Sequence, residues 1–206
     1  MTAIKICGLT RPCDIESVNR SRPEYIGFIL NVPASRRNIS FDDAARLRAL
    51  LAPGIAAVGV FVDEPLDKVA RAADLIGLDV IQLHGAEDDV YIQKARTLTR
   101  RIIWKAFRMT DAFDPAAAEA SPADEILLDS GRGSGETFDW PLADRISRPF
   151  VLAGGLTPEN IPDAVRRLHP KILDLSSGVE TDGVKDSDKI LAAIRAARRA
   201  DDNLKR

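Results

Sequence analysis

The 206-residue sequence is poor in cysteine and histidine and has no long apolar run. Its two cysteines, Cys7 and Cys13, are too few for a disulfide scaffold, so we expect both thiols to be reduced in the cytoplasm. Two histidines, without an HxH, HExxH or CxxC pattern, give no reason to expect a metal site. No run of about 18 apolar residues is present, so we expect no membrane span, and the N-terminus lacks the apolar core of a signal peptide.

An excess of charge of one sign is also missing, because 29 Lys and Arg residues stand against 31 Asp and Glu residues. This balance predicts no surface for nucleic acid or for an anionic membrane. Apolar residues make up 45% of the chain, which is enough for a core. The length fits one domain, residues 1–200, and we expect the polar residues 201–206 to form a frayed tail.

A regular rhythm of short apolar runs is the main structural signal. Segments with helical spacing lie between these runs. Strands that alternate with helices predict a parallel sheet, and eight such units predict an α/β fold, a single closed (β/α)8 TIM barrel. An open doubly wound sheet is the alternative. The eight expected strands are residues 4–7, 25–30, 56–62, 80–83, 102–107, 126–129, 150–153 and 172–175.

Two helix starts can be read from the sequence. Ser40 is a candidate N-cap for a helix over residues 41–51, whose apolar residues follow helical spacing. Thr157 followed by Pro158 predicts a second N-cap, opening a helix over residues 159–168.

The alternation of side chains along each strand predicts which residues face the barrel interior. Residues two apart share a face, and the more apolar set of each strand should face the helices. The inward set then includes polar side chains near the carboxyl ends of the strands, where the active sites of such barrels lie. These inward polar residues are Lys5, Cys7, Gln82, His84, Asp129, Asp174 and Ser176.

Several of these residues allow both a chemical and a structural interpretation. Cys7 can be a general base or nucleophile, or a small buried apolar residue. Asp129 can be a general acid or base, or a capping residue. The adjacent Arg36 and Arg37 can hold a carboxylate or phosphate, or form a solvated basic pair.

Two glycine-containing turns follow the seventh and eighth strands. Gly154 and Gly155, together with Ser177 and Gly178, can bring backbone N–H groups to a phosphate, the usual phosphate position in such barrels. Ordinary turn glycines are the alternative. The glycine-rich residues 131–135 suggest a flexible loop and lack the Lys-Ser/Thr ending of a P-loop.

Taken together, these segments resemble the phosphoribosylanthranilate isomerase family of tryptophan biosynthesis. The opening KICG, the QLHG segment and SSGVE are specific in combination. The matching segments, in family order, are KICGLT at 5–10, GF at 27–28, SRR at 35–37, VGVFV at 58–62, QLHG at 82–85, LLD at 127–129, GSG at 133–135, TFDW at 137–140, LAGGL at 152–156 and DLSSGVE at 174–180.

The resemblance implies an Amadori rearrangement of N-(5′-phosphoribosyl)anthranilate, without metal or cofactor. Asp129 would be the general acid that opens the ribose ring, and Cys7 the general base that removes the C2′ proton. Arg37 would hold the anthranilate carboxylate and Asp174 would contact polar groups of the substrate. His84 would line the pocket without an assigned role, and the phosphate would lie on Gly154, Gly155, Ser177 and Gly178.

Alternatives remain at this point. They include an indole-glycerol-phosphate synthase-like or ribulose-phosphate epimerase-like enzyme, a related histidine-pathway isomerase and a barrel that only binds a phosphorylated ligand. Two features depart from the family: the loop over residues 130–135 is short, and Ala153 stands where serine is common. We expect a monomer or a homodimer with a small-molecule substrate.

Overall fold

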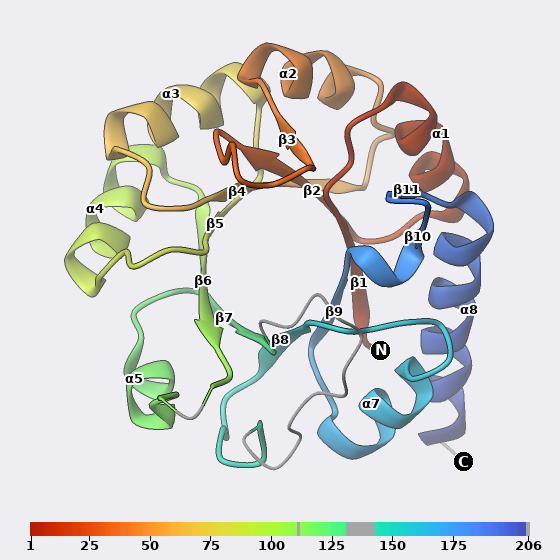
Figure 1. The fold of residues 1–206 in the computed structure, drawn as a ribbon. Helices are drawn as coiled ribbons and strands as arrows, with labels where there is room; N and C mark the ends of the chain where they lie inside the picture. The colour runs from red at the N-terminus through yellow and green to blue at the C-terminus, as the bar shows by residue number, and fades with distance from the viewer. Residues whose placement is uncertain (111, 131–142, 205–206) are drawn as a thin grey trace.

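A closed barrel of eight parallel strands forms the centre of the protein (Figure 1). The computed structural model describes residues 1–110, 112–130 and 143–204. Strand β1 pairs with both β2 and β9, which closes the ring and confirms the predicted barrel. The barrel strands are β1 Ala3–Cys7, β2 Tyr25–Leu30, β4 Ala56–Phe61, β5 Val80–Leu83, β6 Ile102–Arg108, β7 Glu125–Asp129, β8 Phe150–Ala153 and β9 Ile172–Leu175.

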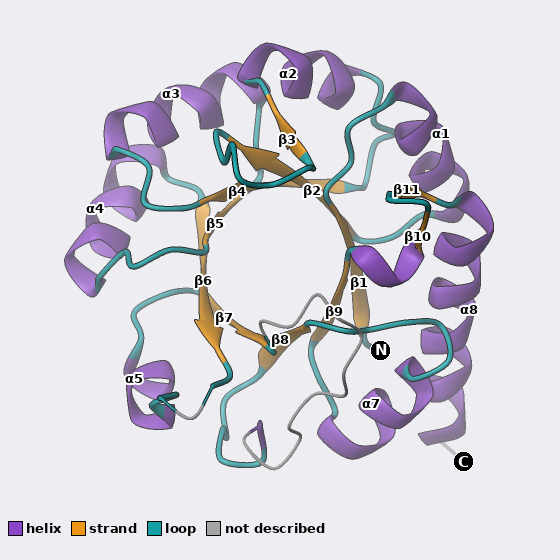
Figure 2. Cartoon of the chain, in the orientation of Figure 1, coloured by secondary structure: helices purple, strands orange, loops and turns teal. Residues whose placement is uncertain are grey.

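Helices surround the barrel on its outside (Figure 2). The short strand β3 (Asn38–Ile39) extends the sheet beside β2, and β10 (Glu180–Thr181) with β11 (Val184–Lys185) forms a separate antiparallel hairpin. A 3₁₀ turn, η1 (Ser177–Val179), precedes this hairpin. The α-helices are α1 Pro12–Ser21, α2 Phe41–Ala49, α3 Leu66–Ile76, α4 Asp89–Thr99, α5 Pro115–Ala120, α7 Ile161–Leu168 and α8 Ser187–Leu204.

The predicted alternation of the strands is confirmed by two separate apolar clusters. The larger cluster lies between strands and helices and contains the outward residues, such as Ile6, Ile81 and Leu173. The smaller one fills the barrel interior below the polar side chains. Its buried members are Val58, Val80, Trp104, Ala106, Leu127, Val151, Ala153 and Ile172.

One of the two predicted helix starts is confirmed and the other is wrong. The Ser40 hydroxyl accepts a hydrogen bond from the Asp43 N–H, as expected for an N-cap, although α2 ends at Ala49. Helix α7 begins at Ile161, not after Thr157. The reason is Asn160, whose side chain accepts from the Thr157 N–H at 2.9 Å and donates to the Gly155 carbonyl at 2.8 Å. These bonds hold the preceding residues in a turn.

The expected frayed tail is also wrong for residues 201–204, which continue helix α8. Asp201 is buried, and its carboxylate accepts hydrogen bonds from the N–H and the hydroxyl of Thr2 at 2.7 and 2.9 Å. The last helix is therefore attached to the first strand. Residues 205 and 206 lie outside the described residues. Across the part of the chain that is described, no helix has the length and apolarity needed to cross a bilayer.

We predict that Asp201→Ala lowers the free energy of unfolding, because it leaves the Thr2 N–H buried without its acceptor. The expected loss is about 1–3 kcal/mol, measured by urea denaturation. Asp202→Ala is the matched control, since Asp202 is the exposed neighbour. Equal stability of the two variants would contradict the assigned role of Asp201.

Candidate active site

A cavity of about 300 Å³ lies at the carboxyl ends of the barrel strands. It brings together residues that are far apart in the sequence, and all the predicted site residues except Gly178 line it. The predicted residues that line it are Cys7, Arg37, His84, Asp129, Gly154, Gly155, Asp174 and Ser177. Strand alternation therefore predicted correctly that Cys7, His84, Asp129 and Asp174 lie together at this end of the barrel.

Cys7 ends strand β1 and is buried beside a glycine on the neighbouring strand. Gly27 is its partner in the β1–β2 register. A Cβ atom at Gly27 would lie 2.8 Å from the Cys7 sulfur and 3.1 Å from Lys5 Nζ. The missing side chain at Gly27 thus leaves the space that both Cys7 and Lys5 occupy.

Lys5 forms a buried ion pair with Asp174 across the strands that close the barrel. Its Nζ lies 2.9 Å from Asp174 Oδ2, and the Lys5 side chain is fully buried. Asp174 Oδ1 is buried without a hydrogen-bond partner among the described residues. Asp174 also lines the cavity, and this oxygen retains an unused capacity to accept a hydrogen bond.

The charge state of Cys7 is set by opposing effects. Burial raises the pKa of the Cys7 thiol, whereas the nearby cations of Lys5 and Lys185 act to lower it. Burial opposes charge on Lys5, but Asp174 and Cys7 outweigh it and raise the pKa of Lys5. Lys5 therefore stays charged beside the sulfur and stabilises the thiolate when it forms.

Asp129 ends strand β7 and is hydrogen-bonded to His84. The His84 Nε2 atom lies 3.1 Å from Asp129 Oδ2, and Gln82 Nε2 lies 3.0 Å from His84 Nδ1. Because the Gln82 amide donates to Nδ1, the imidazole carries its proton on Nε2 and donates to Asp129. This gives His84 a role that the sequence did not assign: it orients the Asp129 carboxyl group.

The loops after β8 and β9 lie in direct contact. A Cβ atom at Gly178 would lie 1.8 Å from the Leu156 carbonyl oxygen, so only glycine allows this approach. Gly154 has a φ of 93°, and a Cβ there would lie 2.0 Å from Ser130 Oγ. In the described part of the chain, the N–H groups of Gly155, Ser177 and Gly178 have no acceptor. Such unpaired N–H groups can bind an anion.

Arg36 and Arg37, although adjacent in sequence, have different positions in the structure. Arg37 lines the cavity, while Arg36 is 59% exposed and does not line it. Both guanidinium groups contact the buried Glu180, which is also bound by Lys185. Sequence reasoning assigned no role to Glu180 or Lys185, because a hairpin distant in sequence brings them to Arg37.

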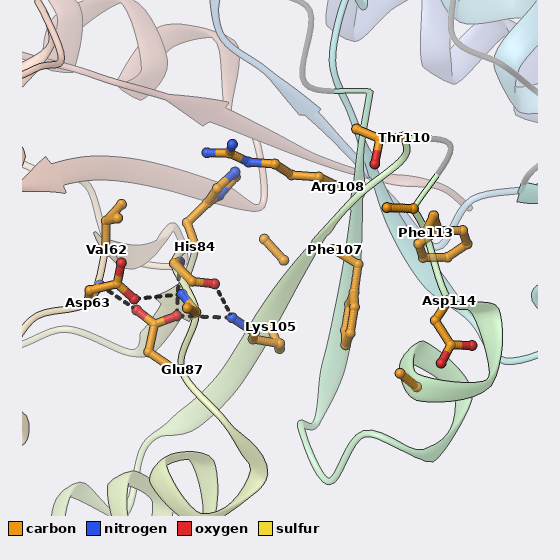
Figure 3. A pocket seen from close by; sticks show the side chains of 15 residues that line it. Val62, Asp63, His84, Glu87, Lys105, Phe107, Arg108, Thr110, Phe113 and Asp114 are labelled. Atoms are coloured by element: carbon orange, nitrogen blue, oxygen red, sulfur yellow. Dashed lines mark hydrogen bonds and ion pairs between the residues drawn. The ribbon is translucent and has the colours of Figure 1, made fainter.

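A second cavity, of about 560 Å³, adjoins the first and shares Val62 and His84 with it (Figure 3). Lys105 lies in its wall, but Lys105 Nζ is bound to the Gly85 carbonyl at 2.6 Å and to Glu87 at 3.0 Å. Arg108 at the end of β6 also lines it; its inward parity was a signal that sequence reasoning missed. This cavity lacks both Cys7 and Asp129, so the smaller one is the candidate active site.

Two further expectations concern metals and the loop after Asp129. Among the described residues, no group of three or more His, Cys, Asp or Glu side chains could hold a metal ion. The expected short flexible loop at residues 131–135, and the GSG and TFDW segments, lie outside the described residues.

Comparisons with known proteins agree on one family. The model of the family described as N-(5′-phosphoribosyl)anthranilate (PRA) isomerase matches residues 4–196. A curated relative from Endomicrobium trichonymphae, named N-(5′-phosphoribosyl)anthranilate isomerase, is 41% identical over 203 residues, which are 96% of this chain and 99% of the relative.

Solved structures give the same result. A structure of monomers generated from the dimeric enzyme of Thermotoga maritima has a TM-score of 0.85 and 38% identity, and the match covers 97% of this chain and 100% of that one. A phosphoribosylanthranilate isomerase in complex with reduced 1-(o-carboxyphenylamino)-1-deoxyribulose 5-phosphate has a TM-score of 0.84 and 36% identity, with the same coverage.

We predict that Cys7 in the folded protein reacts with iodoacetamide only at higher pH than in the unfolded protein. Burial raises the pKa of Cys7, so at a given pH less of it is thiolate. The measurement is the alkylation rate against pH in a Cys13→Ser background, with the same protein in denaturant as the reference. A folded-state midpoint below the denatured one would show that Lys5 and Lys185 outweigh burial.

Proposed function

Because this chain belongs to the N-(5′-phosphoribosyl)anthranilate isomerase family, we propose that Asp129 and Cys7 supply the acid and the base of its reaction. The chain is an aldose–ketose isomerase of tryptophan biosynthesis. Its reaction is the Amadori rearrangement of N-(5′-phosphoribosyl)anthranilate to 1-(2-carboxyphenylamino)-1-deoxyribulose 5-phosphate. The observation that supports the two roles is that a thiol on β1 and a carboxyl group on β7 line one cavity.

The first step uses Asp129 as a general acid. Asp129 donates a proton to the ribose ring oxygen, the C1′–O bond breaks, and the nitrogen lone pair forms an iminium ion with C1′. The His84 hydrogen bond supports this role, since it fixes the orientation of the carboxyl group that must reach the ring oxygen. Asp129 is left as a carboxylate.

The second step uses the Cys7 thiolate as a general base. The sulfur takes the C2′ proton, the C2′–H electron pair forms the C1′=C2′ double bond, and the iminium pair returns to nitrogen. The resulting enolamine becomes the ketone when C1′ gains a proton and the C2′ hydroxyl loses one. Lys5 supports the base, since its ammonium group lies beside the sulfur and favours the thiolate.

The remaining predicted residues bind the substrate in this proposal. The phosphate binds the N–H groups of Gly155, Ser177 and Gly178, where the two loops meet. The anthranilate carboxylate binds Arg37, and Asp174 Oδ1 accepts a hydrogen bond from a ribose hydroxyl. The unpaired N–H groups and the unpartnered Asp174 oxygen support these assignments.

Gly154 contributes to the pocket through the side chain that it lacks. Gly154 leaves the room that Ser130 and Asp129 occupy, so it shapes the pocket beside the acid.

We place the protein in the cytoplasm, a location supported by its two free cysteines. A dimeric relative supports a homodimer, which size-exclusion chromatography with light scattering would distinguish from a monomer.

We predict that Cys7→Ser and Asp129→Asn each lower kcat/KM by about 100-fold or more, because each removes one proton-transfer group. The assay follows the loss of anthranilate fluorescence with freshly made substrate in chelator-containing buffer. Circular dichroism confirms that each variant is folded. A folded Cys7→Ser variant with wild-type turnover would contradict the base assignment, and loss of wild-type activity in chelator would contradict the metal-free mechanism.

We predict that Gly178→Ala raises KM and weakens inhibition by inorganic phosphate, each by roughly 10-fold. The added methyl group forces the two loops apart, at a cost of about 1–3 kcal/mol. The strain arises at the Leu156 carbonyl, which the new Cβ would overlap. Gly54→Ala is the control: a Cβ at Gly54 would have no atom within 4 Å, and Gly54 lies far from the two loops that meet at Gly178. Unchanged phosphate inhibition in Gly178→Ala would refute the phosphate site.

A further inference from the structure

The Arg37 guanidinium is held by a two-bond pair with a single carboxylate. Arg37 Nε lies 2.6 Å from Glu180 Oε1, and Arg37 Nη2 lies 2.8 Å from Glu180 Oε2. Arg37 Nη1 has no partner among the described residues, and the side chain lines the active-site cavity. We propose that Glu180 is a positioning residue for substrate selection, which holds Arg37 so that its free edge meets the substrate carboxylate. This inference rests on the proposed role of Arg37.

Glu180 is itself fixed by the hairpin in which it lies. It is the register partner of Lys185 in the β10–β11 pair, and the turn between them contains two residues of positive φ, Asp182 and Gly183. Lys185 Nζ lies 2.6 Å from Glu180 Oε1 and 3.0 Å from the Ser176 carbonyl. The Arg11 side chain donates to the Lys185 carbonyl at 3.0 Å. The hairpin therefore joins the loops after β1, β2 and β9.

The cations of this cluster favour the ionised form of Glu180. Burial would raise the pKa of Glu180, but hydrogen bonds and charge from Arg37 and Lys185 lower it to about 2. Burial lowers the pKa of Lys185, against the opposing effect of Glu180. The Glu180 carboxylate is thus ionised at any pH at which the enzyme would be assayed.

A held guanidinium discriminates better between ligands than a mobile one. Its planar fork matches a carboxylate, and less side-chain entropy is lost on binding when the fork is already oriented. Removing Glu180 leaves the positive charge of Arg37 but frees its orientation. The loss should therefore fall on the carboxylate of the ligand and not on its phosphate or sugar.

The test measures the affinity of two stable ligands by calorimetry. The first is the reduced product analogue, 1-(2-carboxyphenylamino)-1-deoxypentitol 5-phosphate, and the second is its phenylamino counterpart without the carboxylate. For the wild type we expect a preference for the first ligand on the order of 10- to 100-fold, the range of one charge-assisted contact. In Glu180→Gln we expect this preference to fall by about 10-fold, while the second ligand keeps its affinity within about twofold.

Three variants make the outcome specific. Arg37→Gln should abolish the preference. Arg36→Gln is the matched control and should keep it, because Arg36 also contacts Glu180, at 2.6 Å, but lies outside the cavity. Glu180→Asp retains the charge with a shorter reach and should give an intermediate preference; it carries the test if Glu180→Gln does not fold.

Two results would overturn the inference. Equal weakening of both ligands in Glu180→Gln would show that Glu180 only supports the loops structurally. An unchanged preference in Glu180→Gln, together with its loss in Arg37→Gln, would leave the role of Arg37 intact and refute that of Glu180. If the wild type showed no preference at all, the carboxylate role of Arg37 and the inference would both fail, while the acid–base assignments would be judged by turnover of Cys7→Ser and Asp129→Asn.

Discussion

The buried ion pair between Lys5 and Asp174 is the interaction around which the site is organised. It joins β1 to β9, the two strands whose pairing closes the barrel, and it lies directly beside Cys7. Buried ion pairs seldom add stability over apolar side chains of similar volume. Its position therefore points to the chemistry of the pocket. The pair places a fixed positive charge next to the sulfur of the proposed base, while Asp174 keeps that charge from remaining unpaired.

Cys7 and Asp129, the proposed base and acid, have different surroundings in the pocket. On the β1 side the sulfur is buried among charged groups, so its ionisation depends on fixed cations. On the β7 side Asp129 is 21% exposed and is hydrogen-bonded to the His84 imidazole. His84 also lines the adjoining cavity on this second side, whereas Gly27 keeps the first side closely packed. A substrate that spans the barrel mouth would meet a buried base at one end and a more solvated acid at the other.

The strands and the inward positions of the site residues could be predicted because they depend on local patterns. Alternation within a strand decides which side chain faces the interior, so Cys7, His84, Asp129 and Asp174 could be placed together from sequence. The contacts that failed or were missed depend on partners far away in the chain: Asp201 is bound by Thr2, 199 residues earlier, and Glu180 is reached by Arg37, 143 residues earlier. The predicted start of α7 is wrong because the Asn160 side chain is bonded to the Thr157 N–H and to the Gly155 carbonyl, and these bonds hold the residues before Ile161 in a turn. No periodicity carries such information.

The Thr2–Asp201 contact also fixes the start of β1 beside the last described helix. Thr2, directly before β1, and Asp201, in the last turn of α8, lie together at the amino end of β1. Cys7 and Asp129, the proposed base and acid, are at the opposite, carboxyl ends of the strands. A short linker could therefore join the termini, and new ends could be opened in a surface loop such as that at Pro53 and Gly54, giving a circular permutant with an unobstructed barrel mouth. For the same reason, another protein domain could be fused at either end without covering the entrance to the pocket.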